Sequence, residues 1–115
     1  MRNLMADIES MGGGHNAAII SIGAVKFDPL KGLIGDQFYR TIEWQDCLRW
    51  GATFEWKTIE WWAQQSATAK RRTWCGGSLL VEALADFSMF CGKNARVWSN
   101  APGFDLRILR ENYTR

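Results

Sequence analysis

Two acidic side chains stand one residue apart near the start of the chain, in the segment NLMADIESMGGGHN (residues 3–16). Residues 3–9 are mostly apolar and predict a buried strand. In a strand, side chains two residues apart point to the same face, so Asp7 and Glu9 project together while Ile8 points into the core. Such close carboxylates repel unless a cation lies between them, and Mg²⁺ and Mn²⁺ prefer carboxylate oxygens. The pair is therefore either two surface acids beside a turn or half of a metal site.

A third carboxylate follows a second apolar stretch near the end of the chain. Residues 95–99 predict a short buried strand, and Asp105 comes after it in the segment NAPGFD, where a helix is expected to begin. Taken alone, Asp105 is explained as an acid favoured by the helix dipole. A strand that is parallel and adjacent to residues 3–9 would instead bring Asp105 beside Asp7 and Glu9, where open α/β sheets bind their ligands. The three acids together favour the metal site.

The elements that must position these acids begin with three strands. Residues 17–28 are rich in β-branched side chains, and residues 36–43 place Phe38, the aliphatic part of Arg40 and Ile42 on one face. The linkers between the strands are short and contain glycine, which predicts an antiparallel meander.

Helical periodicity replaces strand periodicity after residue 43. Thr58 is expected to N-cap a helix within KTIEWWAQQS, and apolar residues at helical spacing predict a helix over 78–91 with Ser78 as N-cap. Gly92 is expected to end that helix. The order β-β-β-α-(α)-β-α predicts an α/β fold, in which helices flank a mixed sheet made of the meander and one parallel strand.

Composition sets limits on the class of protein. The 115 residues are expected to form a single domain, and the net charge of +2 permits nucleic-acid binding without requiring it. Three cysteines without a CxxC pair indicate neither a disulfide framework nor a zinc knuckle. We find no signal peptide and no apolar run long enough to span a membrane, so a cytoplasmic location is expected.

Two features have both a structural and a binding interpretation. The seven Trp residues either fill the core or form part of a partner or substrate surface. The basic run at residues 70–72 is typical of a solvated helix end, with phosphate contact as the alternative.

The motifs taken together resemble those of the 3′–5′ exonucleases of the RNase T/DnaQ-like (DEDD) superfamily. The segments DIES, SIGAVKFD, WWAQQS and NAPGFD carry the resemblance, which runs from Leu4 to about Tyr113. The first motif of the family, D-x-E, matches Asp7 and Glu9, and the second, N-x-x-x-F-D, matches residues 100–105. The phage and prophage exonuclease VIII-like branch is the most similar, although Ser10 replaces its usual Thr.

The resemblance implies an RNase H-like fold and hydrolysis of phosphodiesters from a 3′ end with two Mg²⁺ or Mn²⁺ ions. Asp7 would bridge both ions, Glu9 would bind one, and Asp105 would bind the other. The substrate would be single-stranded or 3′-overhanging RNA or DNA, and the motifs do not decide between the two. Residues expected at the substrate are Ser10, Met11, Gly12, Trp61, Asn100 and Phe104.

The family also has a third motif, with a His or Tyr general base and a final Asp ligand, about fifty residues beyond Asp105. This chain ends at Arg115, and its one histidine, His15, is not at the position of that base. We therefore expect an incomplete exonuclease domain over residues 1–115 that lacks the last strand and helix of the fold. Strand 95–99 would then present an open edge that favours homodimer formation. The alternative function is that of an inactive remnant that retains metal or nucleic-acid binding, or only self-association.

Overall fold

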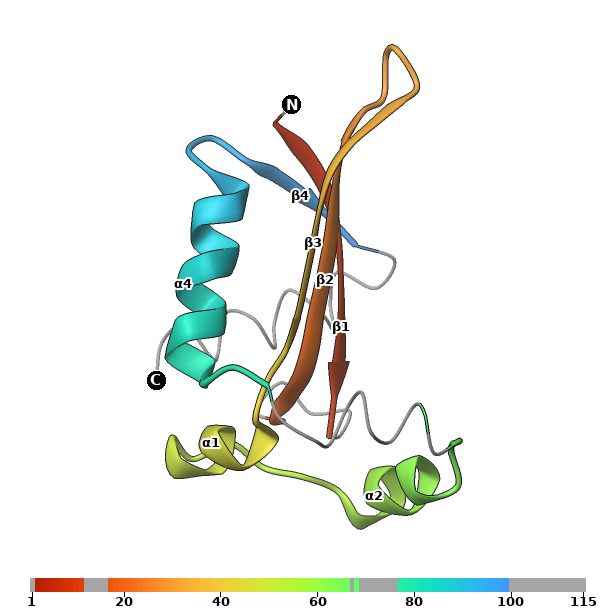
Figure 1. Cartoon of the computed structure of the whole chain (residues 1–115), viewed down its shortest axis with the longest axis vertical. Helices are drawn as coiled ribbons and strands as arrows, with labels where there is room; N and C mark the ends of the chain where they lie inside the picture. Colours follow the sequence, from red (N-terminus) through yellow and green to blue (C-terminus); the bar gives the residue numbers. More distant parts are fainter. Residues whose placement is uncertain (1, 12–16, 67, 69–76, 100–115) are drawn as a thin grey trace.

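The computed structural model describes residues 2–11, 17–66, 68 and 77–99. These residues form a four-stranded sheet with helices beside it and at one end (Figure 1). The strands and helices, in chain order, are β1 (Asn3–Ser10), β2 (Ile19–Asp28), β3 (Leu33–Thr41), α1 (Trp44–Arg49), α2 (Trp56–Ala63), α4 (Leu80–Cys91) and β4 (Arg96–Trp98).

The sheet has the strand order β3-β2-β1-β4. β2 pairs antiparallel with both β1 and β3, which confirms the predicted meander. β4 returns parallel to β1, with Asn3 opposite Arg96 and Met5 opposite Trp98. The sequence order places α4 between β3 and β4, as the predicted crossover requires. β1 therefore lies inside the sheet, between an antiparallel and a parallel neighbour.

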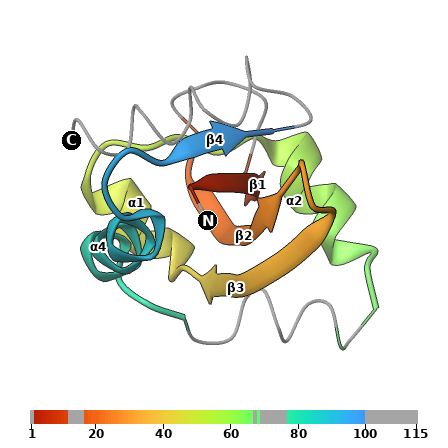
Figure 2. The ribbon, with the colours of Figure 1, turned by 90° about the horizontal axis from the view of Figure 1, so that it is seen from above.

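One face of the sheet packs against α4 and forms the core (Figure 2). The even-numbered side chains of β1 (Leu4, Ala6 and Ile8) are buried on this face. The side chains of α4 that cover them recur at helical spacing: Leu80, Ala83, Leu84 and Phe87. This is the apolar stripe that the sequence predicted for the helix, and burying it holds α4 on the sheet.

The β3 side of the core is made of aromatic contacts. The Phe38 ring centroid lies 5.5 Å from that of Phe87 and 5.3 Å from that of Phe90. The Arg40 guanidinium lies 4.7 Å from the Phe38 ring centroid, and its Nε is 3.5 Å from the Asp86 carboxylate. Ile42 is fully buried. The predicted common face of Phe38, Arg40 and Ile42 is thus confirmed, with Arg40 covering the ring at the solvent boundary.

Two predicted N-caps are wrong. α2 begins at Trp56, and Thr58 lies inside its first turn, where the Thr58 N–H donates to the Glu55 carbonyl (3.1 Å). α4 begins at Leu80, so Ser78 is not its N-cap. Ser78 instead exchanges backbone hydrogen bonds with Thr41 and Glu43 just after β3. The end of α4 agrees with the prediction, since Gly92 has the positive φ (70°) that glycine adopts without strain.

The start of α4 depends on a helix that the sequence did not indicate. α1 is a six-residue helix, and its Asp46 is 4% exposed. Asp46 Oδ2 accepts the Leu80 N–H at 2.8 Å, so a carboxylate distant in the sequence does what an N-cap side chain would do locally. The other carboxylate oxygen lies 3.4 Å from Nη1 of the exposed Arg49.

Neither of the two cysteines in the described part of the chain forms a disulfide. Cys47 is buried beside the Ile19 carbonyl, and partial burial raises the pKa of the Cys91 thiol against the opposing effect of Lys26. A raised pKa keeps the Cys91 thiol protonated, which does not suit a nucleophile. No helix in the described ranges is long and apolar enough to cross a membrane.

Replacing Asp46 with Ala should destabilise the protein by about 1–3 kcal/mol, because the buried Leu80 N–H loses its acceptor. Urea unfolding followed by circular dichroism measures this change. Arg49→Ala is the control, since Arg49 is exposed and surface ion pairs contribute about 0–1 kcal/mol. Equal losses in the two variants would show that the carboxylate does not stabilise the start of α4.

Candidate active site at the carboxyl end of β1

Asp7 and Glu9 lie on the face of β1 that points away from α4. The burial of β1 alternates, with Leu4, Ala6 and Ile8 at most 4% exposed and with Asp7 and Glu9 exposed. The predicted arrangement of these residues is therefore present, because the core anchors the strand through Ile8 between the two acids. Their carboxylates emerge side by side on one surface, with α-carbons about 6.5–7 Å apart.

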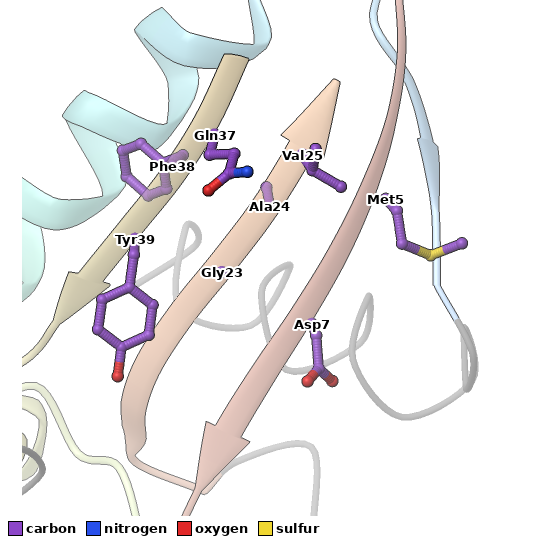
Figure 3. A pocket seen from close by; sticks show the side chains of 8 residues that line it. All are labelled: Met5, Asp7, Gly23, Ala24, Val25, Gln37, Phe38 and Tyr39. Carbon is purple, nitrogen blue, oxygen red and sulfur yellow. The ribbon is translucent and has the colours of Figure 1, made fainter. Parts of the chain in front are cut away.

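A shallow hollow of about 450 Å³ lies beside Asp7 on the sheet. The strand register places Asp7 opposite Gly23 of β2, and Gly23 opposite Tyr39 of β3. Figure 3 shows the Asp7 carboxylate and the Tyr39 ring on either side of the Gly23 backbone. The residues that line the hollow are Met5, Asp7, Gly23, Ala24, Val25, Gln37, Phe38 and Tyr39.

The hollow exists because Gly23 has no side chain. A Cβ placed there would lie 3.7 Å from Cδ2 of Tyr39 and 3.8 Å from the Asp7 carbonyl oxygen, which are ordinary contact distances. A methyl group therefore fits, whereas a larger side chain would occupy the space next to the carboxylate. Tyr39 is half exposed, so its hydroxyl remains available at the rim.

The backbone beyond Glu9 is held on both sides. The strand register shifts between Glu9 and Ser10. Past this irregularity, the Met11 N–H donates to the Ala18 carbonyl (2.9 Å) and the Met11 carbonyl accepts the Glu55 N–H (2.8 Å). The Ala18 N–H in turn donates to the Thr53 carbonyl at 2.8 Å. The end of β1 is thus joined to β2 and to the segment before α2, which fixes where Glu9 stands.

Three of the other predicted site residues lie in the described part of the chain, and the rest do not. Ser10 is half-buried at the end of β1, and Trp61 is exposed on α2. Met11 is fully buried in the core, so in this arrangement its side chain cannot pack on a substrate base as expected. Four predicted site residues lie outside the described residues: Gly12, Asn100, Phe104 and Asp105. His15 also lies outside them.

The chemistry of the two acids suits a hard divalent cation. Two exposed carboxylates offer oxygen ligands, and Mg²⁺ sites commonly use one or two carboxylates together with water and substrate phosphate. Within the described ranges no three His, Cys, Asp or Glu side chains come together as a metal-binding group. Of the three predicted metal ligands, Asp7 and Glu9 lie in the described ranges, and their carboxylates suit a divalent cation.

Gly23 and Tyr39 were not predicted as site residues. Their relation to Asp7 depends on the register of three strands, and a register cannot be read from one strand at a time. The only signal in the sequence was a glycine inside a strand otherwise rich in β-branched residues, which is typical of a close approach or a space.

Replacing Gly23 with Ala should leave the free energy of unfolding within about 1 kcal/mol of the original, because the new methyl meets only ordinary contacts. Gly77→Ala is the matched comparison and should be clearly more destabilising. Its φ is +120° and its Cβ would lie 2.9 Å from backbone atoms of Ile42 and Glu43. Denaturant titration measures both, and a Gly23→Ala loss as large as that of Gly77→Ala would contradict this account of the hollow.

Solved structures of Exonuclease I have a fold similar to that of this chain. The chain superposes on E. coli Exonuclease I in complex with a dT13 oligonucleotide with a TM-score of 0.73 at 15% identity, covering 97% of this chain and 23% of that one. Apo Exonuclease I gives 0.72 at 15% identity, with coverage of 97% and 24%. The zinc-bound form of the E. coli Exonuclease I complex with single-stranded DNA gives 0.73 at 15% identity, with coverage of 97% and 23%. The chain thus spans about a quarter of the length of these structures, and the likeness confirms the RNase H-like exonuclease fold.

The family comparison is more specific. Comparison with curated proteins gave no match. One family model, described as the 3′-5′ exoribonuclease Rv2179c-like domain, matches residues 2–115. The comparisons support a 3′–5′ exonuclease but not the predicted exonuclease VIII-like branch of phages and prophages. With nearly its whole length matched, the chain belongs to the 3′-5′ exoribonuclease Rv2179c-like domain family.

Proposed function

We propose that this chain is a nuclease domain that removes nucleotides from the 3′ end of single-stranded or 3′-overhanging nucleic acid with the help of divalent cations. The observation that carries the proposal is the pair of exposed carboxylates, Asp7 and Glu9, on one face of β1 in a chain of a 3′–5′ exoribonuclease family. The structural likeness to an exonuclease bound to single-stranded DNA supports the same class of substrate.

Asp7 and Glu9 would hold the cations, with Asp105 as the predicted third ligand. Two bound Mg²⁺ or Mn²⁺ ions would supply a nucleophilic water at neutral pH and stabilise charge on the leaving 3′ oxygen. The protein contributes the position of the ligands. Ile8, buried between the two acids, prevents β1 from rotating, and the hydrogen bonds at Met11 hold the strand end. Pre-positioned charge of this kind needs no reorganisation during the reaction.

The hollow at Gly23 would receive part of the terminal nucleotide. It adjoins Asp7 directly, and Met5 and Val25 contribute apolar side chains to its lining two residues farther along β1 and β2. The Tyr39 hydroxyl at its rim can donate or accept a hydrogen bond. A sugar or base edge placed there would leave the phosphodiester next to the carboxylates.

Metal binding should be detectable through stability. A cation that binds only the folded chain stabilises it by about 2.7 kcal/mol when its concentration is about 100 times its Kd. We expect Mn²⁺ to raise the Tm of the unmodified chain in a calorimetric scan, and Asp7→Asn to abolish most of the rise.

Asp36→Asn is the matched control for the metal experiment. Asp36 is an exposed carboxylate of the same sheet, two residues before the core-facing Phe38. It should keep the full response to Mn²⁺. A response that survives Asp7→Asn, or that is lost equally in Asp36→Asn, would mean that β1 does not hold the cation.

Hydrolysis is tested with 5′-labelled single-stranded RNA and DNA, with Mn²⁺ or EDTA. The unmodified chain should shorten the strand from its 3′ end only with Mn²⁺, and the ratio of the RNA and DNA rates gives the preference. Asp7→Asn and Glu9→Gln should each slow trimming at least about 100-fold, the scale of losing one group that stabilises transition-state charge. Asp36→Asn should trim normally. Absence of trimming from the unmodified chain at every Mn²⁺ concentration would contradict the proposal and favour the inactive alternative.

A further inference from the structure

Exposed aromatic side chains gather in the stretch between α1 and the middle of α2. In the described part of the chain, Trp50, Phe54, Trp56 and Trp61 are 46%, 39%, 71% and 52% exposed. Exposing large rings costs hydrophobic free energy, and a cluster of them is typical of a binding surface. Of the four, Trp56 is the most exposed.

This aromatic stretch is attached to the end of the strand that carries the acids. The Thr53 carbonyl accepts the Ala18 N–H, and the Glu55 N–H donates to the Met11 carbonyl, both at 2.8 Å. Met11 is two residues after Glu9 and Trp56 is one residue after Glu55. Successive α-carbons are about 3.8 Å apart and the hydrogen-bonded link adds up to about 7 Å, so the α-carbons of Trp56 and Glu9 lie within about 18 Å of each other.

The two views of the fold place α2 on the same side as the acids. α2 lies at the end to which the β1 arrow points, and on the side of the sheet opposite α4 (Figures 1 and 2). Asp7 and Glu9 also project from the face opposite α4, because Ile8 between them faces the core. A strand of nucleic acid with its 3′ end at the acids could therefore continue over the start of α2.

The geometry of Trp56 suits a stacking surface. Its ring meets the Phe54 ring edge to face, with centroids 5.8 Å apart and an interplanar angle of 84°. This contact restricts the orientation of the indole while most of its surface stays in solvent, so little conformational entropy is lost on binding. The first turn of α2 includes the exposed Lys57, which offers a cation to a phosphate beside the exposed carboxylates of Glu55 and Glu60.

We infer that Trp56, supported by Phe54, stacks on a base of the single-stranded nucleic acid whose 3′ end is proposed to lie at Asp7 and Glu9. The inference rests on the proposed function for the identity of the ligand. Every base has a π face, so the contact adds affinity without selecting a sequence. It would keep the strand on the enzyme through successive cleavages of any sequence.

The test measures binding in a background that does not shorten the strand. Fluorescence anisotropy follows the binding of a labelled ten-nucleotide single strand, and of an abasic strand of the same length, to the Asp7→Asn chain. Adding Trp56→Ala should weaken binding of the normal strand about 5- to 100-fold and that of the abasic strand less than about 2-fold. Trp56→Phe should restore most of the affinity, and Leu30→Ala, at the exposed tip of the β2–β3 hairpin, should change neither.

The abasic strand separates stacking from a structural effect. Equal weakening for both strands, no weakening for either, or no binding of the normal strand by the Asp7→Asn chain would overturn the inference. Hydrolysis is judged separately, from cleavage of the p-nitrophenyl ester of thymidine 5′-monophosphate by the chain with Asp7 and Trp56 intact. If Trp56-dependent binding persists where this ester and RNA are not cleaved, the stacking role stands and the proposed hydrolysis fails.

Discussion

The alternation of side chains along β1 is the constraint on which both the core and the candidate site depend. Leu4, Ala6 and Ile8 must be buried against α4, and this alone turns Asp7 and Glu9 to the other face. A slip of one residue in the pairing of β1 would bury the carboxylates and expose the apolar side chains, at a cost of several kcal/mol. Because β1 pairs with β2 on one side and β4 on the other, such a slip would also break two ladders. Burial of the even-numbered side chains thus positions the two acids on the opposite face.

The same strand connects the site to the rest of the molecule at its carboxyl end. Met11 is buried, and its backbone links β2 to the segment that leads into α2. The buried Met11 side chain packs in the core and holds the irregular backbone just after Glu9 in place. The exposed aromatics are carried instead by the segment that Met11 holds, which brings the surface of α2 close to the acids.

Much of this arrangement could be predicted from one sequence. Strand periodicity and glycine-containing linkers were enough for the meander, the parallel return of β4 and the common face of Phe38, Arg40 and Ile42. Sequence patterns for helix starts failed where the capping group came from a distant part of the chain. Thr58 and Ser78 have the side chains of N-cap residues, yet the Asp46 carboxylate of α1 accepts the first N–H of α4. The backbone of Ser78 instead hydrogen-bonds to Thr41 and Glu43 at the end of β3. α1 itself was missed because six residues are too few for a helical period to show.

The sequence by itself determined that Asp7 and Glu9 share one strand face and that Ile8 between them is buried, because strand geometry leaves no other choice once residues 3–9 form a strand. Their neighbours were decided only by the tertiary structure. Gly23 and Tyr39 reach Asp7 through the register of three strands, and Trp56 approaches the end of β1 through the backbone hydrogen bond between Glu55 and Met11, which are more than forty residues apart. Such relations come from the simultaneous packing of several elements, and no spacing within a single segment encodes them.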